Sequence, residues 1–253
     1  MPGLKITFLR RASPFTLQAI AWFPTRLALS VFGRFEVRGR KRLRGVSQAI
    51  FAVNHSNEAD PILLTAALGP AGCFSPLFYV MIPQKEVEGS YQGWHERKLY
   101  KTWFFEAWGS YALVRGLRDY EGSLGSHVAI LKQGGSLCIF PEGGFTKTGE
   151  LREFRGGVIH LSRESGVPIV PVAITGSYGM TFRSFFRRKQ RLILEFGESI
   201  AAAQFKDVTP EQYRAKAARI AENIAGMKDR HAKNTSSDGE GGNKKKSSAI
   251  LPP

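Results

Sequence analysis

His55 and Asp60 stand close together in the segment VNHSNEAD, residues 53–60, with four residues between them. If this loop folds back, the Asp60 carboxylate can accept a hydrogen bond from one ring nitrogen of His55, which fixes the tautomer and raises the basicity of the other nitrogen. Such a histidine can act as a general base on a hydroxyl that the substrate itself brings. On spacing alone, the simpler interpretation is favoured, in which Asp60 caps the following helix and His55 is a polar loop residue.

A second polar turn, FPEGG at residues 140–144, follows another apolar segment. Gly143 and Gly144 allow the backbone to approach a ligand closely or to donate N–H groups to an anion. Glu142 is a candidate to bind a substrate hydroxyl, and a first cation, Lys147, follows shortly after. The alternative is an ordinary Pro-Gly turn with a solvated carboxylate.

Two further segments carry weaker signals. Arg115 lies at the end of GSYALVRG, residues 109–116, where a single arginine is more often a surface charge. Pro168 and Pro171 punctuate VPIVPV, residues 167–172, and their simplest role is to shape a strand edge. Neither segment predicts chemistry by itself.

Taken together and in this order, the four segments resemble the glycerolipid acyltransferase family, which includes the 1-acylglycerol-3-phosphate acyltransferases. The matching segments are NHSNEAD, GSYALVRG, FPEGGFTKTGELREF and VPIVPVAI, within roughly residues 34 to 200. By this resemblance, His55 is the catalytic base and Asp60 is the carboxylate that orients it. The resemblance also implies a contact of Arg115 with a substrate phosphate, a substrate-binding turn at Glu142 and Gly143, and a link of Pro168 and Pro171 to acyl-donor binding or to support of the site.

The activity that this resemblance implies is transfer of a fatty acyl group from a thioester, either acyl-CoA or acyl carrier protein, to a free hydroxyl of a lysophospholipid. The first candidate acceptor is 1-acylglycerol-3-phosphate, which would give phosphatidic acid. His55 would remove the hydroxyl proton, backbone N–H groups near the His55 loop or the Gly143–Gly144 turn would stabilise the oxyanion, and a thiolate would leave. No metal or redox cofactor is required.

Two departures from the family pattern concern the head group of the acceptor. Many members have an arginine two residues beyond the glycine of the third matching segment. The first cation in that segment here is Lys147, and lysine is a weaker bidentate partner for phosphate. Many members also have an aspartate where this chain has Val114. Another lysophospholipid or hydroxylated lipid therefore remains an alternative acceptor. A non-catalytic protein of the same fold that binds anionic lipid is a further alternative.

These polar segments lie between apolar stretches that predict alternating strands and helices. Strands are predicted at 49–53, 77–82, 136–140, 168–174 and 191–197, with a short extended piece within 109–116. Helices are predicted at 61–69, 119–135, 158–165 and 209–227, the last begun by a capping box of Thr209 and Gln212. This alternation predicts an α/β fold, a single domain at 34–227 with a mixed, largely parallel sheet flanked by helices.

Both ends of the chain differ in character from this domain. The apolar stretch SPFTLQAIAWFPTRLALSVFG is interrupted by Pro24 and Arg26, so it predicts two amphipathic helices within residues 1–33 that lie in a membrane interface. Phe15, Trp22 and Phe23 are the expected anchors, and packing as two core helices is the alternative. Residues 228–253 contain few apolar side chains and predict a disordered basic tail.

The net charge of +15 predicts anionic partners. Basic clusters at 34–44 and 183–191 fit either a solvated face or a phosphate site. We expect an anionic membrane surface as partner and a membrane-associated protein on the cytoplasmic face. Nucleic acid is supported by charge alone, without a recognised motif, so no specific nucleic acid is expected. Cys73 and Cys138 lie in no metal-binding spacing, so we expect them to be reduced and expect no metal site.

Overall fold

The computed structural model describes residues 8–70, 74–81, 102–114 and 119–240. Its centre is a seven-stranded sheet in the order β1-β7-β6-β2-β5-β3-β4, in which every pair is parallel except β6 with β7. The strands are β1 (Glu36–Arg38), β2 (Ile50–Val53), β3 (Leu77–Met81), β4 (Ser110–Ala112), β5 (Ser136–Ile139), β6 (Ile169–Thr175) and β7 (Ile193–Phe196). The predicted α/β class with a mixed, largely parallel sheet is confirmed.

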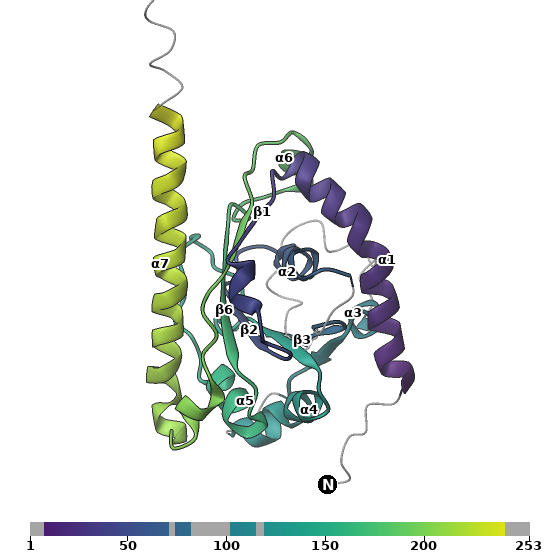
Figure 1. The fold of residues 1–253 in the computed structure, drawn as a ribbon, viewed down its shortest axis with the longest axis vertical. Coiled ribbons are helices and arrows are strands. Elements are labelled where there is room, and N and C mark those ends of the chain that lie inside the picture. The colour runs from purple at the N-terminus through teal and green to yellow at the C-terminus, as the bar shows by residue number, and fades with distance from the viewer. Residues whose placement is uncertain (1–7, 71–73, 82–101, 115–118, 241–253) are drawn as a thin grey trace, which may run out of the picture.

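Helices cover both faces of this sheet (Figure 1). They are α1 (Phe8–Phe32), α2 (Asp60–Leu68), α3 (Thr102–Trp108), α4 (Tyr120–Lys132), α5 (Gly157–Ser165), α6 (Phe182–Phe186) and α7 (Tyr213–Glu240). Short 3-10 helices occupy Arg40–Leu43, Ala202–Phe205 and Pro210–Gln212. The capping box of Thr209 and Gln212 is present, and it begins the turn that leads into α7.

The middle strand β2 contributes to two hydrophobic cores, because its side chains alternate between the faces of the sheet. Ile50 and Ala52 pack with α4, α5 and α7, whereas Phe51 and Val53 pack with α1 and α2. All four side chains are fully buried. A strand that is covered on both faces has apolar residues at every position, which is why the segment AIFAV predicted a strand.

The N-terminal segment forms one helix where two were expected, since α1 runs unbroken through Pro24. A proline removes only one helical hydrogen bond, and packing against α2 and α3 can compensate for it. Trp22, expected as a membrane anchor, instead turns towards α2, where its Nε1 donates to the Ala66 carbonyl at 3.1 Å. Within the described residues, no helix is both long enough and apolar enough to span a bilayer.

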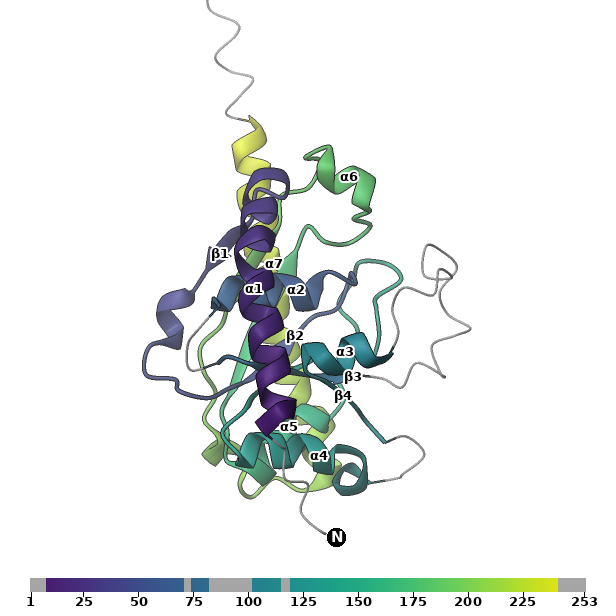
Figure 2. The same ribbon diagram turned by 90° about the vertical axis from the view of Figure 1, so that its right-hand side faces the viewer.

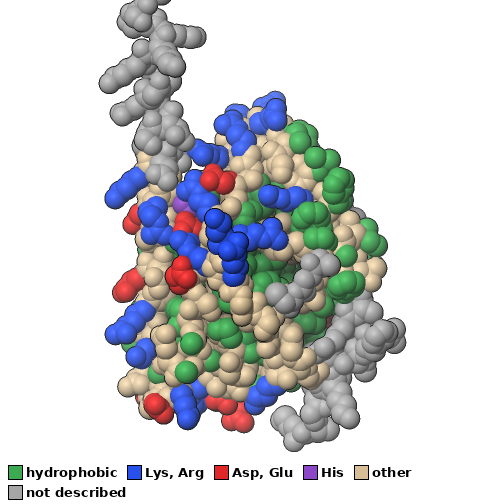
Figure 3. All heavy atoms as spheres, in the orientation of Figure 1, with side chains coloured by type: hydrophobic (Ala, Val, Ile, Leu, Met, Phe, Trp, Pro, Cys, Tyr) green, Lys and Arg blue, Asp and Glu red, His purple; other side chains and the backbone are tan. Residues whose placement is uncertain are grey.

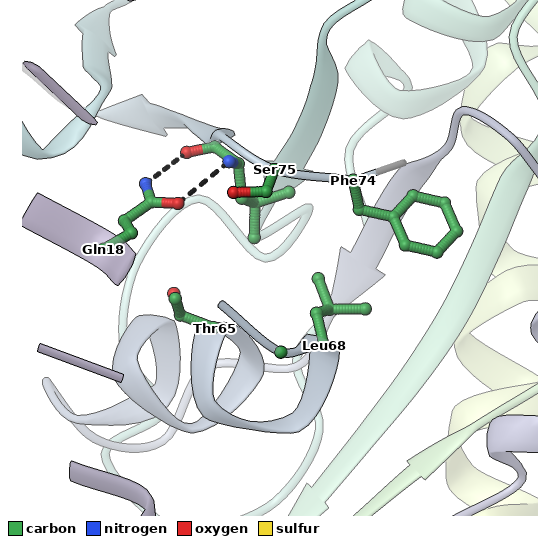
Figure 4. A pocket seen from close by; sticks show the side chains of 7 residues that line it. Gln18, Thr65, Leu68, Phe74 and Ser75 are labelled. Carbon is green, nitrogen blue, oxygen red and sulfur yellow. Dashed lines mark hydrogen bonds between the residues drawn. The ribbon is translucent and has the colours of Figure 1, made fainter. Parts of the chain in front are cut away.

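Gln18 explains how α1 is attached to the sheet. Its side-chain amide donates to the carbonyls of Leu77 and Trp108, each at 2.8 Å, and its carbonyl accepts from the Leu77 N–H at 3.0 Å. The amide lies beside a cavity of about 20 Å³ between α1, α2 and β3 (Figure 4). That volume holds one water molecule at most and is too small for an acyl chain.

The C-terminal helix α7 also extends further than expected. It reaches Glu240, so the disordered tail predicted from residue 228 is wrong for residues 228–240, while residues 241–253 lie outside the described part of the chain. The reason is polar and long-range, since His231 is 2% exposed and pairs with the buried Glu195 of β7 at 2.7 Å. Arg42 and Arg230 also bond to Glu195. Apolar periodicity could not reveal this contact.

Candidate active site

The site begins where β2 leaves the sheet. Asn54 follows the strand and is 2% exposed. Its side-chain amide donates to the Ile174 carbonyl of β6 at 3.0 Å, and its side-chain oxygen accepts the Ile174 N–H at 2.7 Å. These two bonds hold the start of the loop against β6, so His55 leaves the sheet at a defined place. Asn54 was not recognised as a site residue from the sequence.

The loop does fold back, as the first interpretation of His55 and Asp60 required. Nδ1 of His55 lies 3.0 Å from Oδ2 of Asp60, whose side chain is fully buried. The same Oδ2 accepts the N–H groups of Ser56 at 2.7 Å and Asn57 at 2.8 Å. Asp60 makes no side-chain cap of α2, so its carboxylate serves the histidine loop and not the helix end.

Two phenyl rings enclose the imidazole of His55. The ring of Phe140 stacks on it at 3.8 Å between centroids and 17° between planes, and the ring of Phe145 lies at 4.0 Å and 40°. The His55 side chain is 13% exposed, and its Nε2 has no hydrogen-bond partner among the described residues. One nitrogen is therefore held by Asp60, and the other is available to a substrate. Neither phenylalanine was predicted to belong to the site.

Glu142 lies beside His55 because β5 is the parallel neighbour of β2, so the carboxyl ends of both strands meet at one edge of the sheet. Its side chain is 2% exposed. Oε1 accepts the His55 N–H at 2.7 Å, and Oε2 accepts the Arg152 N–H at 3.0 Å. Burial raises the pKa of Glu142. Both carboxylate oxygens thus bond to backbone N–H groups of the protein, whereas the sequence had suggested that Glu142 binds a substrate hydroxyl.

The turn after Glu142 requires its glycines. Gly143 has φ 69° and Gly144 has φ 157°, and the Gly143 N–H donates to the Phe140 carbonyl at 3.0 Å. A Cβ on Gly143 would lie 2.8 Å from Nε of Arg155, and one on Gly144 would lie 3.2 Å from Nη1 of Arg152. Two guanidinium groups therefore flank the turn. The Gly144 N–H has no hydrogen-bond partner among the described residues and remains a possible donor to an anion.

The other predicted residues differ in how closely they join this site. Lys147 is exposed, and its carbonyl accepts from the Tyr178 hydroxyl at 2.9 Å. Pro168 and Pro171 act in the sheet, where their carbonyls accept the N–H groups of Ile50 and Gly197. Arg115, the predicted phosphate contact, lies outside the described residues.

The segment after β6 also reaches the histidine loop. Oγ of Ser177 lies 2.9 Å from Oγ of Ser56, and the carbonyl of Met180 accepts from the Asn57 side chain at 3.0 Å. On the other side, the Thr146 N–H donates to the His55 carbonyl at 3.0 Å. The loop is thus tied to the segments that follow both neighbouring strands, which fixes the position of His55.

Comparison with known proteins places this chain in a family. A family model described as acyltransferase matches residues 34–175, which is more than half of the chain. A probable 1-acyl-sn-glycerol-3-phosphate acyltransferase of Mycoplasma pneumoniae is 29% identical over 134 residues, which are 51% of this chain and 45% of the relative. A 1-acyl-sn-glycerol-3-phosphate acyltransferase of Cocos nucifera is 46% identical over 50 residues, 20% of this chain and 16% of the relative. The chain therefore matches about half, or less, of the length of these curated relatives.

A solved structure shares the fold. The crystal structure of the 1-acyl-sn-glycerophosphate (LPA) acyltransferase PlsC from Thermotoga maritima superposes with a TM-score of 0.58 at 18% sequence identity. The match covers 85% of this chain and 79% of that one, and at this identity it speaks for the architecture alone. The sequence match over residues 34–175 carries the assignment, and the chain belongs to the acyltransferase family.

Proposed function

We propose that this protein transfers a fatty acyl group from an acyl thioester to the free hydroxyl of a lysophospholipid. The observation that carries the proposal is the buried Asp60 carboxylate on Nδ1 of His55, with Nε2 left to a substrate. The relatives named 1-acyl-sn-glycerol-3-phosphate acyltransferases support 1-acylglycerol-3-phosphate as the acceptor and phosphatidic acid as the product. Acyl-CoA and acyl carrier protein are both retained as donors, and no metal or redox cofactor takes part in the proposed reaction.

The proposed reaction needs no nucleophile from the protein. Nε2 of His55 accepts the proton of the acceptor hydroxyl, and the oxygen attacks the thioester carbonyl carbon. The negative charge moves to the carbonyl oxygen, for which the Gly144 N–H is the candidate donor. The C–S bond then breaks, and the imidazolium returns its proton to the departing thiolate. Asp60 stabilises the imidazolium and holds its tautomer without becoming protonated itself.

Glu142 acts in this proposal as a positioning residue. It bonds the backbone N–H groups of His55 and Arg152, so it holds the general base against the glycine turn. Its burial and its two internal partners support this role over a direct contact with the substrate. The contact with a substrate hydroxyl that the sequence suggested is therefore not part of the proposed mechanism.

The guanidinium groups of Arg152 and Arg155 and the exposed Lys147 support an anionic acceptor. The two guanidinium groups lie against the glycine turn and Lys147 follows it by three residues, so an anion bound at the turn would meet positive charge. Arg115 is kept as a phosphate contact on the strength of the family resemblance. These residues are expected to determine the affinity for the head group and not the rate of the chemical step.

The outer face of α1 supports a position at a membrane. Ile20 is 70% exposed, Phe23 is 68% exposed and Leu27 is 55% exposed, and the spacing of three and four residues places them on one side of the helix. The net charge of +15 favours an anionic surface. A place on the cytoplasmic face is part of this proposal.

The deciding experiment measures thiol release from long-chain acyl-CoA, with and without lysophosphatidic acid, for the wild type and for His55→Ala. We expect release that requires both the acceptor and His55. The same assay is repeated with acyl carrier protein as donor and with a panel of lysolipids. Wild-type and His55→Ala proteins that behave alike under every combination would refute the proposal and favour a non-catalytic lipid-binding protein.

A further inference from the structure

The short helix α6 presents aromatic side chains to the outside of the molecule. Phe182 is 70% exposed and Phe186 is 44% exposed, and they lie one helical turn apart. The helix is well defined despite its length, because the Thr181 side chain accepts the Ser184 N–H at 3.1 Å and the Ser184 hydroxyl accepts the Thr181 N–H at 2.9 Å. Two large exposed rings on a capped helix form a fixed apolar surface.

Positive charge surrounds these rings. The exposed cations are Arg183, Arg187, Arg188 and Lys189, and no acidic residue occurs between residues 176 and 194. In the part of the chain that the structure describes, none of the four forms an ion pair. We call the two rings and these four cations the α6 patch. Its charge is left for an external anion.

The α6 patch continues the apolar outer face of α1. The ring of Phe32, the last residue of α1, lies 4.8 Å from the ring of Phe186 and 5.9 Å from that of Phe185. Nε of Arg188 donates to the Val31 carbonyl at 2.7 Å, which ties the two helices together. Lys and Arg side chains gather at the end of the molecule where α6 lies, next to the hydrophobic side chains along α1 (Figure 3).

The α6 patch is also connected to the site. The segment between β6 and α6 bonds the histidine loop through Ser177 and Met180, whose partners are Ser56 and Asn57. The N–H groups of the same two loop residues hold the Asp60 carboxylate. Because β6 and β2 are parallel neighbours, α6 and His55 follow the same edge of the sheet. Figure 2 shows α6 projecting away from the body of the fold.

We infer that the α6 patch is a second membrane contact, adjoining the outer face of α1, whose rings enter the head-group region while its cations bind anionic phospholipid. Aromatic rings flanked by cations are suited to this interface, where apolar and charged groups can both be satisfied. Docking of α6 would hold the histidine loop at the bilayer surface, where a lysolipid acceptor resides. The inference extends the proposed function, since it rests on the acceptor being a lipid.

The test is co-sedimentation of the full chain with vesicles of phosphatidylcholine alone and of phosphatidylcholine mixed with phosphatidylglycerol. The charge variant is Arg183→Gln, Arg187→Gln and Lys189→Gln, which spares Arg188 because its side chain bonds α1. The matched control is Lys132→Gln, Lys206→Gln and Arg219→Gln, three exposed cations on elements at the other face of the sheet. Each triple variant lowers the net charge of +15 by three, so only the position of the charge differs.

We expect the charge variant to lose roughly fivefold in partitioning onto the anionic vesicles for each cation removed, or about a hundredfold together. The control should lose less than about threefold, since charges far from the surface are screened. A second variant, Phe182→Ser with Phe186→Ser, should lose at least about tenfold on both kinds of vesicle. Far-UV circular dichroism and thermal melting verify that each variant is folded.

If the charge variant and its control lose partitioning onto the anionic vesicles equally, the inference is overturned. Unchanged vesicle binding of a folded Phe182→Ser, Phe186→Ser protein would also overturn it. If the protein binds DNA through the α6 patch but does not bind vesicles, the inference is overturned in favour of a nucleic-acid surface. If the phenylalanine variant does not fold, the charge variant and its control still decide. The vesicle assay contains no acyl donor, so it measures membrane binding alone. A negative result in it would leave the proposed His55-dependent acyl transfer standing. Loss of acyl transfer would in turn leave vesicle binding unchanged.

Discussion

Replacing Glu142 with alanine should damage both the stability of the protein and the chemical step. The carboxylate accepts the N–H groups of His55 at 2.7 Å and Arg152 at 3.0 Å, and it is 2% exposed. Alanine has no acceptor, so two backbone donors would lose their partners inside the protein. One of those donors belongs to the proposed general base.

The two backbone donors left without partners set the size of this effect. A buried donor left without a partner costs about 1–3 kcal/mol, so two cost about 4 kcal/mol. The buried carboxylate also carries a desolvation cost, which is why the pKa of Glu142 is raised. The substitution removes this cost, so the expected net loss of unfolding free energy lies in the lower half of the range of about 2–6 kcal/mol for two unpaired donors, at about 3 kcal/mol. If all of it also appears in the transition state, kcat falls about a hundredfold.

Urea unfolding at neutral pH and thiol-release kinetics measure the two effects. We expect the KM for the acceptor to change less than about threefold, because Glu142 is not expected to contact the substrate. Glu142→Gln should recover about half of the lost stability and at least about tenfold in kcat, since its one carbonyl oxygen can serve one of the two N–H groups. Glu150→Ala, an exposed neighbour, should stay within about 0.5 kcal/mol of the wild type. A folded Glu142→Ala protein of wild-type stability whose acceptor KM rises would refute the positioning role.

Three further changes test other parts of the same structure. Asp60→Asn should lower kcat by about 100-fold to 10,000-fold, because an amide cannot hold the required His55 tautomer, and steady-state kinetics within tenfold of the wild type would remove Asp60 from the mechanism. Asn54→Ala should lower the unfolding free energy in urea by about 2–4 kcal/mol, since the buried N–H and carbonyl of Ile174 both lose their hydrogen-bond partner. The same change at the exposed Gln204 should leave the unfolding free energy unchanged. Burial lowers the pKa of His127 to about 4, below its unfolded value of 6.5, so the wild type should lose about 3 kcal/mol of stability as the pH falls from 6.5 to 4. Denaturant titrations between pH 6.5 and pH 4 should show that His127→Gln loses less unfolding free energy than the wild type. An equal dependence of unfolding free energy on pH in both proteins would contradict the assigned burial of His127.

The segments that sequence patterns predicted well are those whose signals are local. The continuous apolar run at residues 49–53 predicted β2 because a strand covered on both faces needs no polar positions. The capping box of Thr209 and Gln212 predicted the start of the C-terminal helical region for a similar reason, since both partners lie within one turn. The short elements β1, α3 and α6 were not predicted, because a few residues carry too little periodicity to be recognised.

The sequence by itself determined the fold class, the family and the candidate dyad of His55 and Asp60, since these depend on residue type, local spacing and the order of motifs. Only the tertiary structure decided what surrounds the dyad. Glu142 lies 87 residues from His55, and Asn54 lies 120 residues from Ile174. Those contacts exist because β5 and β6 flank β2 in the sheet, and hydropathy does not encode the order of strands. The same reason explains α7, whose helical extension past residue 228 depends on a buried partner in β7.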